Sequence, residues 1–192
     1  MNGAVNRLLH SRTIRFLWRL AVRSLAAVGL VTLIYLAGFD YSRMVSDSMS
    51  PTLQGNHWDS GDRVLSERVS YWFRTPRRWE VIAFRHENGN RIMKRIVGLP
   101  GESITMRRDG TIFIDGHETP PPAELPLLRN HYLPYGNLMD GKPVACGRGY
   151  YVLGDETKDA DDSRFNPPVM PEQILGRAWL ILGPADRRGF VR

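Results

Sequence analysis

The feature that most constrains this chain is an uncharged apolar run near its N-terminus. Residues 24–39 (SLAAVGLVTLIYLAGF) carry no charge, and extension back to residue 20 adds only Arg23 as an interruption. Twenty helical residues span about 30 Å, roughly the hydrocarbon thickness of a bilayer, and a long arginine side chain can reach the interface. A run of this length predicts either a membrane-spanning helix or a buried core helix.

The residues that flank the run favour the membrane. Residues 1–39 contain five arginines and no Lys, Asp or Glu, an asymmetry typical of a segment held on the cytoplasmic side. The basic region is long for a cleavable signal peptide, and Tyr35-Leu36-Ala37 lacks the small-x-small pattern of a cleavage site. We therefore expect a basic cytoplasmic segment over 1–19, an uncleaved transmembrane anchor over 20–39, and an extracytoplasmic domain over 40–192.

Charge and cysteine content exclude several classes of partner. The chain carries +6, of which residues 1–39 carry +5, so residues 40–192 carry 6 − 5 = +1. A nucleic-acid partner is not expected, because it requires a strongly basic face on the folded part. Cys146 is the single cysteine of the sequence, so no internal disulfide or thiolate zinc site is expected. We expect no metal and no organic cofactor.

Beyond residue 40 the apolar residues form short runs bounded by Gly, Pro and Asp, a pattern typical of β-strands. Seven strands are expected, at residues 63–69, 80–84, 91–97, 103–106, 111–114, 150–153 and 177–182. The Asp109-Gly110 pair predicts a hairpin turn. Residues 117–149, rich in Pro, Gly, Asn and Leu, are expected to form an irregular insertion. The fold class is therefore mainly β, preceded by one transmembrane helix.

Three polar clusters could carry chemistry. In the first, Ser46 and Ser48 would share a face if their segment is extended, although a Ser-rich run before a proline is most often a plain turn. In the second, Lys94 would share one apolar face of a strand with Ile92 and Ile96. Such a lysine either protects a sheet edge or has a pKa lowered by burial, which makes it a general base. The third is the acidic loop 154–164, which lacks the ligand spacing of an EF-hand.

Three motifs occur in order after the anchor: Ser-Met-x-Pro-Thr-Leu from Ser48, Lys-Arg-x-Val-Gly-Leu-Pro-Gly from Lys94, and Gly-Asp-x₆-Asp-Ser-Arg over 154–164. Together they resemble the type I signal peptidase family of membrane-bound serine proteases. The shorter motifs Gly-Asp-Arg-Val-Leu at 61–65 and Gly-Arg-Ala at 176–178 match as well. The resemblance extends over residues 46–182.

The resemblance implies a catalytic domain of antiparallel sheets that uses a Ser–Lys dyad. Ser48 then matches the nucleophile and Lys94 the general base, while the Ser46 hydroxyl and the Ser48 backbone N–H match the oxyanion hole. It also implies small S1 and S3 pockets, lined in part by Met49, Ile92 and Met93, and hence cleavage after Ala-x-Ala-type sites in signal peptides. The expected supporting residues are Asp155, Asp162 and Arg164. The five histidines are expected to be structural or solvated.

Some positions depart from the family pattern. Ala160 stands where a serine usually bonds the catalytic lysine, Glu156-Thr157 replace Asn-Arg, and Trp79-Glu80 replace Gly-Asp. Two alternatives stay open: a maturation peptidase of a conjugation or pilus system with the same chemistry, and an inactive membrane-tethered binding module. A self-cleaving repressor would need a DNA-binding motif where the apolar anchor lies.

The expected location is the inner (cytoplasmic) membrane, with the N-terminus in the cytoplasm. Nine positions separate Phe39 from Ser48, at most about 30 Å of extended chain, so the nucleophile is expected to work close to the lipid. Trp72 and Phe73, with Tyr71, Trp58 and several arginines nearby, form a cluster suited to a bilayer interface. We expect Trp72 and Phe73 at a loop tip, and Trp79 either there or in the core.

Overall fold

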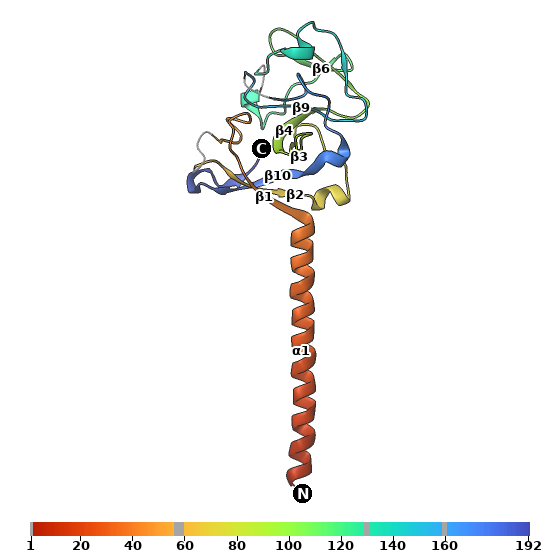
Figure 1. Ribbon diagram of the computed structural model, residues 1–192, viewed down its shortest axis with the longest axis vertical. Helices are drawn as coiled ribbons and strands as arrows, with labels where there is room; N and C mark the ends of the chain where they lie inside the picture. Colours follow the sequence, from red (N-terminus) through yellow and green to blue (C-terminus); the bar gives the residue numbers. More distant parts are fainter. Residues whose placement is uncertain (1, 56–59, 129–130, 159–160) are drawn as a thin grey trace. The chain divides into compact units, whose positions relative to one another are not determined.

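The computed structural model describes residues 2–55, 60–128, 131–158 and 161–192. They fall into two compact units, Met1–Gly38 and Phe39–Arg192. The first unit is helix α1 (Asn2–Gly38), a single uninterrupted helix in Figure 1. Its portion Arg12–Gly38 is long and apolar enough to cross a membrane, by length and composition. The helix thus includes basic residues upstream of the apolar run.

The second unit is built from antiparallel sheet, as predicted. Among the described residues, the larger sheet has the order β1-β2-β10-β3-β4-β9, with β11 paired to β10. Its strands are β1 (Phe39–Arg43), β2 (Arg63–Glu67), β3 (Val81–Arg85), β4 (Arg91–Gly98), β9 (Tyr151–Leu153), β10 (Ile174–Gly183) and β11 (Gly189–Phe190). The smaller sheet has the order β7-β6-β5-β8 and contains β5 (Ser103–Met106), β6 (Ile112–Ile114), β7 (His117–Glu118) and β8 (Val144–Ala145).

All seven strands predicted from the sequence are present, with ends shifted by a few residues. The predicted hairpin is the β5–β6 pair, in which Ile104 lies opposite Ile114 and Gly110 has a φ of +85°. The strands that were not predicted, β1, β7, β8 and β11, are short. Two of them lie within 117–149, whose other described residues form loops and short 3₁₀ turns, among them Pro126–Leu128 and Gly136–Leu138.

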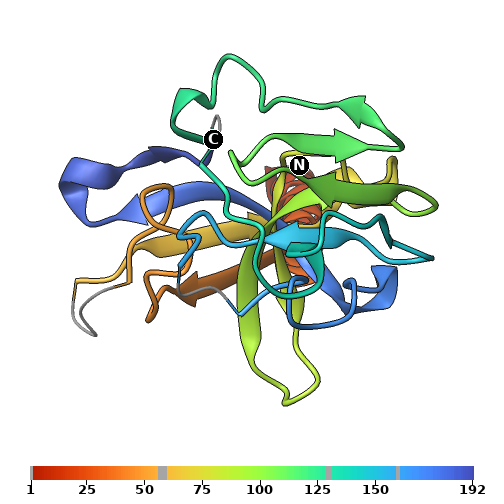
Figure 2. The same cartoon turned by 90° about the horizontal axis from the view of Figure 1, so that it is seen from above.

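The register of β3 against β4 fixes the position of Lys94. Ile82 pairs with Lys94 and Phe84 with Ile92, so these four side chains share one face of the sheet. On that face Ile82 and Phe84 belong to a buried apolar cluster, with Ile92 packed against it. Figure 1 places β6 of the smaller sheet at the far end of this unit from β1 and β2. In Figure 2 the β3–β4 hairpin, in yellow-green, projects beyond the other strands.

Candidate active site

Ser48 lies in a turn that follows β1. The backbone N–H of Ser48 donates to Oγ of Ser46 (3.2 Å), and the N–H of Ser50 donates to the carbonyl of Asp47 (2.7 Å). The two serines therefore meet through a local turn, whereas the sequence suggested an extended segment. Serine hydroxyls commonly bond nearby backbone N–H groups in this way.

Packing of the neighbouring residues holds this turn in place. Met49 is completely buried in a core cluster that also contains Met44 and Leu53. Gly61, from the Gly-Asp-Arg-Val-Leu motif, passes so close to the loop that a Cβ would lie 2.1 Å from the carbonyl oxygen of Met44. Glycine at position 61 thus allows the two backbones to touch.

Lys94 reaches Ser48 from the middle of β4. Its Nζ lies 2.7 Å from Oγ of Ser48, and only 1% of the residue is exposed. Burial lowers the pKa of Lys94 from 10.5 to about 8, because desolvation penalises the ammonium form. The carboxylates of Asp162, Asp161 and Asp155 oppose this shift, and the Arg164 guanidinium adds to it.

The residue after Lys94 ties β4 to the acidic loop. Arg95 and Asp155 form a fully buried ion pair of 2.6 Å. The same carboxylate accepts a hydrogen bond of 2.5 Å from the hydroxyl of Thr52, four residues after Ser48. The N–H of Glu156 donates to the carbonyl of Ser48 (3.1 Å). Asp155 therefore joins the turn that contains Ser48 to the strand that carries Lys94.

Residues 131–133, a segment of the irregular region, form hydrogen bonds to the acidic loop. The Tyr132 hydroxyl donates to the Asp155 carboxylate (2.9 Å), and a ring nitrogen of His131 contacts the Asp155 carbonyl. The N–H of Leu133 donates to Oγ1 of Thr157 (2.9 Å). These contacts were not predicted from the sequence, because residues 117–149 have no recognisable hydrophobic period.

Asp162 and Arg164 form a second buried pair within the acidic loop. Their side chains are 2.7 Å apart at the closest atoms and have no exposed surface. Asp162 also accepts the N–H of Gly154, and Arg164 donates to the carbonyls of Leu133 and Thr157. Together these bonds fix the loop that faces Lys94. Ala160, which replaces the usual supporting serine, lies outside the described residues.

A cavity of about 520 Å³ opens in front of the serine and the lysine. Its wall contains the predicted residues Ser46, Ser48, Ile92, Met93 and Lys94, together with Asp40, Ser42, Arg43, Met44, Val45, Ala83, Asn90, Arg91 and Asp161. Met49 was predicted to contact substrate, but it is buried in the core and lies outside this wall. Its contribution is to anchor the loop that carries Ser48. Within the described parts of the chain, no group of three or more His, Cys, Asp or Glu could hold a metal ion.

Comparison with known proteins identifies the family. Residues 17–182 match the model of signal peptidase, peptidase S26. A probable signal peptidase I-2 of Synechocystis sp. is 30% identical over 173 residues, covering 86% of this chain and 71% of that protein. Signal peptidase I of Leptolyngbya laminosa is 30% identical over 172 residues, covering 85% and 76%. A crystal structure of a signal peptidase I from Enterococcus faecalis V583 matches with a TM-score of 0.43 and 29% identity, covering 54% of this chain and 97% of that one.

The chain belongs to the signal peptidase family, peptidase S26. It is a serine peptidase, and thus a hydrolase. The substrates of signal peptidases are exported preproteins with signal peptides. Family membership and the apolar N-terminal helix together indicate a membrane-anchored protein.

Proposed function

We propose that this chain is a single-pass membrane endopeptidase that removes signal peptides by means of a Ser48–Lys94 dyad. The observation that carries the proposal is the contact of 2.7 Å between Oγ of Ser48 and a buried lysine amine. A neutral amine accepts a proton, whereas an ammonium group does not. A pKa of about 8 for Lys94 leaves a useful fraction of neutral amine near pH 7.

In the acylation step, the amine of Lys94 takes the proton of Ser48 as Oγ attacks the scissile carbonyl carbon. The resulting ammonium then gives this proton to the departing amine of the mature protein as the C–N bond breaks. An ester between Ser48 and the signal peptide remains. In the second step Lys94 takes a proton from water, the hydroxide attacks the ester, and Ser48 recovers its proton.

The negative charge that develops on the carbonyl oxygen needs hydrogen-bond donors. The Ser48 N–H and the Ser46 hydroxyl are adjacent and bonded to each other at 3.2 Å. When the oxyanion forms, both groups are free to donate to it in place of this mutual bond. Donors that are held in position before the charge develops account for a large share of catalysis in acyl transfer.

The signal-peptide side of the substrate is proposed to lie along the first half of β4. β9 pairs with one edge of β4 only from Arg95 onward, while β3 pairs with the other edge over residues 91–95. Residues 91–94 therefore present a free strand edge among the described residues, beside the cavity that contains Ser48. An extended peptide can add to such an edge. Ala83 and Met93 lie in the cavity wall, and we propose that the cavity accepts small side chains of an Ala-x-Ala site.

The proposed location is the inner membrane, with α1 spanning the bilayer and its arginine-rich start in the cytoplasm. The support is the charge asymmetry of the helix, which has arginines at its beginning and no acidic residue in its first turn. Unit Phe39–Arg192 then acts outside the cytoplasm, where signal peptides emerge. The bilayer itself is a proposed partner of this unit, through Trp72 and Phe73.

An inactive tethered module is disfavoured because it has no need of a buried lysine in contact with a serine. The conjugation or pilus peptidase shares the dyad, and the choice of substrate separates it from the general enzyme. The test is to incubate the purified full-length chain in detergent with a preprotein that carries an Ala-x-Ala site, and to sequence the new N-terminus. The proposal expects a single cut directly after the second alanine. An uncut preprotein, or a cut at unrelated positions, contradicts it.

A further inference from the structure

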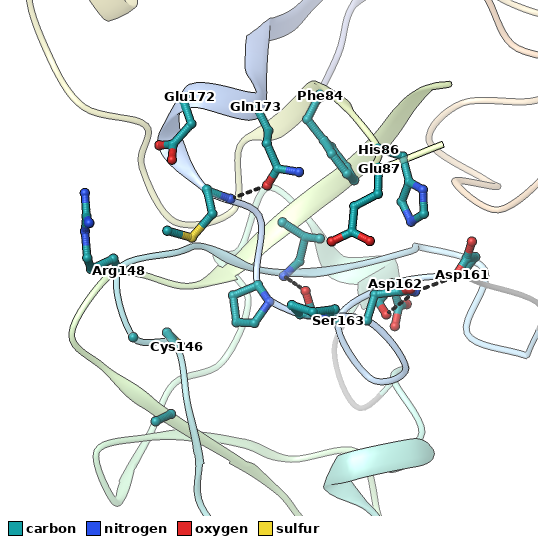
Figure 3. Close-up of a pocket in the computed structure, with 17 residues that line it drawn as sticks. Phe84, His86, Glu87, Cys146, Arg148, Asp161, Asp162, Ser163, Glu172 and Gln173 are labelled. Carbon is teal, nitrogen blue, oxygen red and sulfur yellow. Dashed lines mark hydrogen bonds between the residues drawn. The ribbon is translucent and has the colours of Figure 1, made fainter. Parts of the chain in front are cut away.

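A second groove adjoins the cavity that contains Ser48. Its volume is about 480 Å³, and its walls are mostly apolar, with Phe84, Val152 and Met170 among the lining residues. Asp161 lines both the groove and the cavity, so the groove begins where the active-site cavity ends. Figure 3 shows Asp161 at one end of the groove and Arg148 at the other.

The chemistry of the reaction indicates which part of a substrate this groove faces. The acyl portion lies along residues 91–94 of β4, and the departing amine must be beside Lys94 to receive its proton. The first residues of the mature protein therefore leave from the lysine side of the cavity. Asp161 borders that cavity and contributes to the electrostatic field at Lys94. A groove that continues from Asp161 is in line to hold the residues after the scissile bond.

The groove carries an excess of negative charge. Within the described part of the chain, neither Glu87 nor Glu172 forms a hydrogen bond or an ion pair, and Figure 3 shows the Glu87 carboxylate directed into the space above Ser163. Asp162 is neutralised by its bidentate contact with Arg164. Three carboxylates, those of Glu87, Asp161 and Glu172, thus face one guanidinium, that of Arg148, at the distant end.

We propose that this groove binds the first few residues of the mature protein and favours a basic side chain among them, through the carboxylate of Glu87. The inference rests on the proposed peptidase function and adds a specificity on the leaving side of the scissile bond. A groove of 480 Å³ falls within the usual range of ligand sites. Because the carboxylate is exposed, its preference should be modest, about threefold, and should weaken in high salt.

The test uses the full-length chain in detergent and peptides that share one Ala-x-Ala signal sequence. Each of the first six mature positions is occupied in turn by Lys, Gln or Glu, and kcat/KM is measured. The proposal expects Lys to exceed Gln by about threefold, and Gln to exceed Glu, at one or two positions. Glu87→Gln should abolish the ratio of Lys to Gln. Glu118→Gln changes an exposed carboxylate outside the groove and should retain that ratio.

The outcomes separate this proposal from the one on which it rests. Equal kcat/KM for Lys, Gln and Glu at every position, or an unchanged ratio in Glu87→Gln, overturns the groove assignment while the peptidase activity stands. If the wild-type chain cleaves none of the peptides and also leaves a full preprotein uncut, the proposed function itself fails.

Discussion

Oγ of Ser48 and Nζ of Lys94 are in hydrogen-bond contact at 2.7 Å, although 46 residues separate them along the chain. One side chain comes from a turn after an edge strand and the other from the interior of β4. Asp155 connects the two segments, because it accepts bonds from both Thr52 and Arg95. The geometry of the pair is thus maintained by a buried polar network behind it.

The pH dependence of cleavage should follow the titration of Lys94. Burial lowers the pKa of this amine to about 8, and the neutral form is the proposed base. The plot of kcat/KM against pH should therefore rise as pH increases towards 8 and level off above it. The expected measurement is kcat/KM on a peptide without ionisable groups at the cleavage site.

Asp161→Asn tests the cause of this pKa. The Asp161 carboxylate favours the charged form of Lys94, so its removal should move the rising limb to lower pH. Asp140→Asn, at an exposed position outside the active-site cavity and the adjoining groove, serves as the control and should leave the rising limb in place. A limb that moves to higher pH in Asp161→Asn contradicts the assignment.

Ser46→Ala should lower kcat by about 10²–10³-fold with little change in KM, because it removes one donor from the proposed oxyanion hole. Steady-state kinetics with a signal-peptide substrate give both constants. Ser50→Ala, in the same turn but outside the cavity wall, should have a far smaller effect. A change confined to KM would mean that Ser46 only positions the substrate.

Tyr132→Phe should reduce kcat about tenfold through misalignment of the dyad. The variant removes the hydroxyl that bonds Asp155 but keeps the buried ring, so the core should remain filled. Tyr151→Phe is a matched control, since its buried hydroxyl bonds Asn137 (2.7 Å). Both variants lose one hydrogen bond, and both should lose similar stability in thermal unfolding. Equal loss of kcat in the two variants would indicate a merely structural role for Tyr132.

The alternation of polar and apolar residues predicted much of the site. On β4 it placed Lys94 beside Ile92 and Ile96, and the structure confirms this face. The Ser-Met-x-Pro-Thr-Leu motif indicated Ser48 as the candidate nucleophile. Hydrophobic periodicity and sequence motifs both extend over only a few residues, so they predict strands and short loops well. The local turn that joins Ser46 to Ser48 depends on the packing of Met49 and Gly61, which no local pattern reports.

The buried network behind Ser48 and Lys94 could not be predicted for a related reason. Tyr132 and Asp155 are 23 residues apart and lie in segments without regular structure, so only the folded chain brings them together. Trp79 provides a second case. It has a φ of +70°, a conformation that favours glycine, and its carbonyl accepts a bond from Arg95. From the sequence, Trp79 was noted only as a departure from the glycine of the family pattern, without a link to backbone conformation.

Trp72 and Phe73 should contact lipid when the full-length chain is reconstituted in vesicles. They lie at the end of a 3₁₀ turn (Val69–Trp72) and are 49% and 85% exposed, as predicted for a loop tip. Trp79 instead packs against the core. Trp58 lies outside the described residues. Exposed aromatic side chains favour the bilayer interface. The measurement is the emission of an environment-sensitive fluorophore on Phe73→Cys.

Met139→Cys provides the reference for this experiment, since Met139 is 64% exposed and lies beside a different turn. The native Cys146 should remain unlabelled, because it is buried and burial raises its pKa to about 11. We expect a blue shift at position 73 in anionic vesicles and none at position 139. Emission typical of water at both positions contradicts the prediction.

The most direct test of the dyad is preprotein cleavage by Ser48→Ala, Lys94→Ala, Lys94→Arg and the Ser48→Ala/Lys94→Ala double variant, each with its fold checked by circular dichroism. Residues that act as one catalytic unit are strongly non-additive, and a guanidinium does not deprotonate at these pH values. The account predicts that all four variants lose cleavage and that the double variant is no worse than either single one. Turnover by folded Lys94→Ala near neutral pH at a rate close to wild type would contradict it.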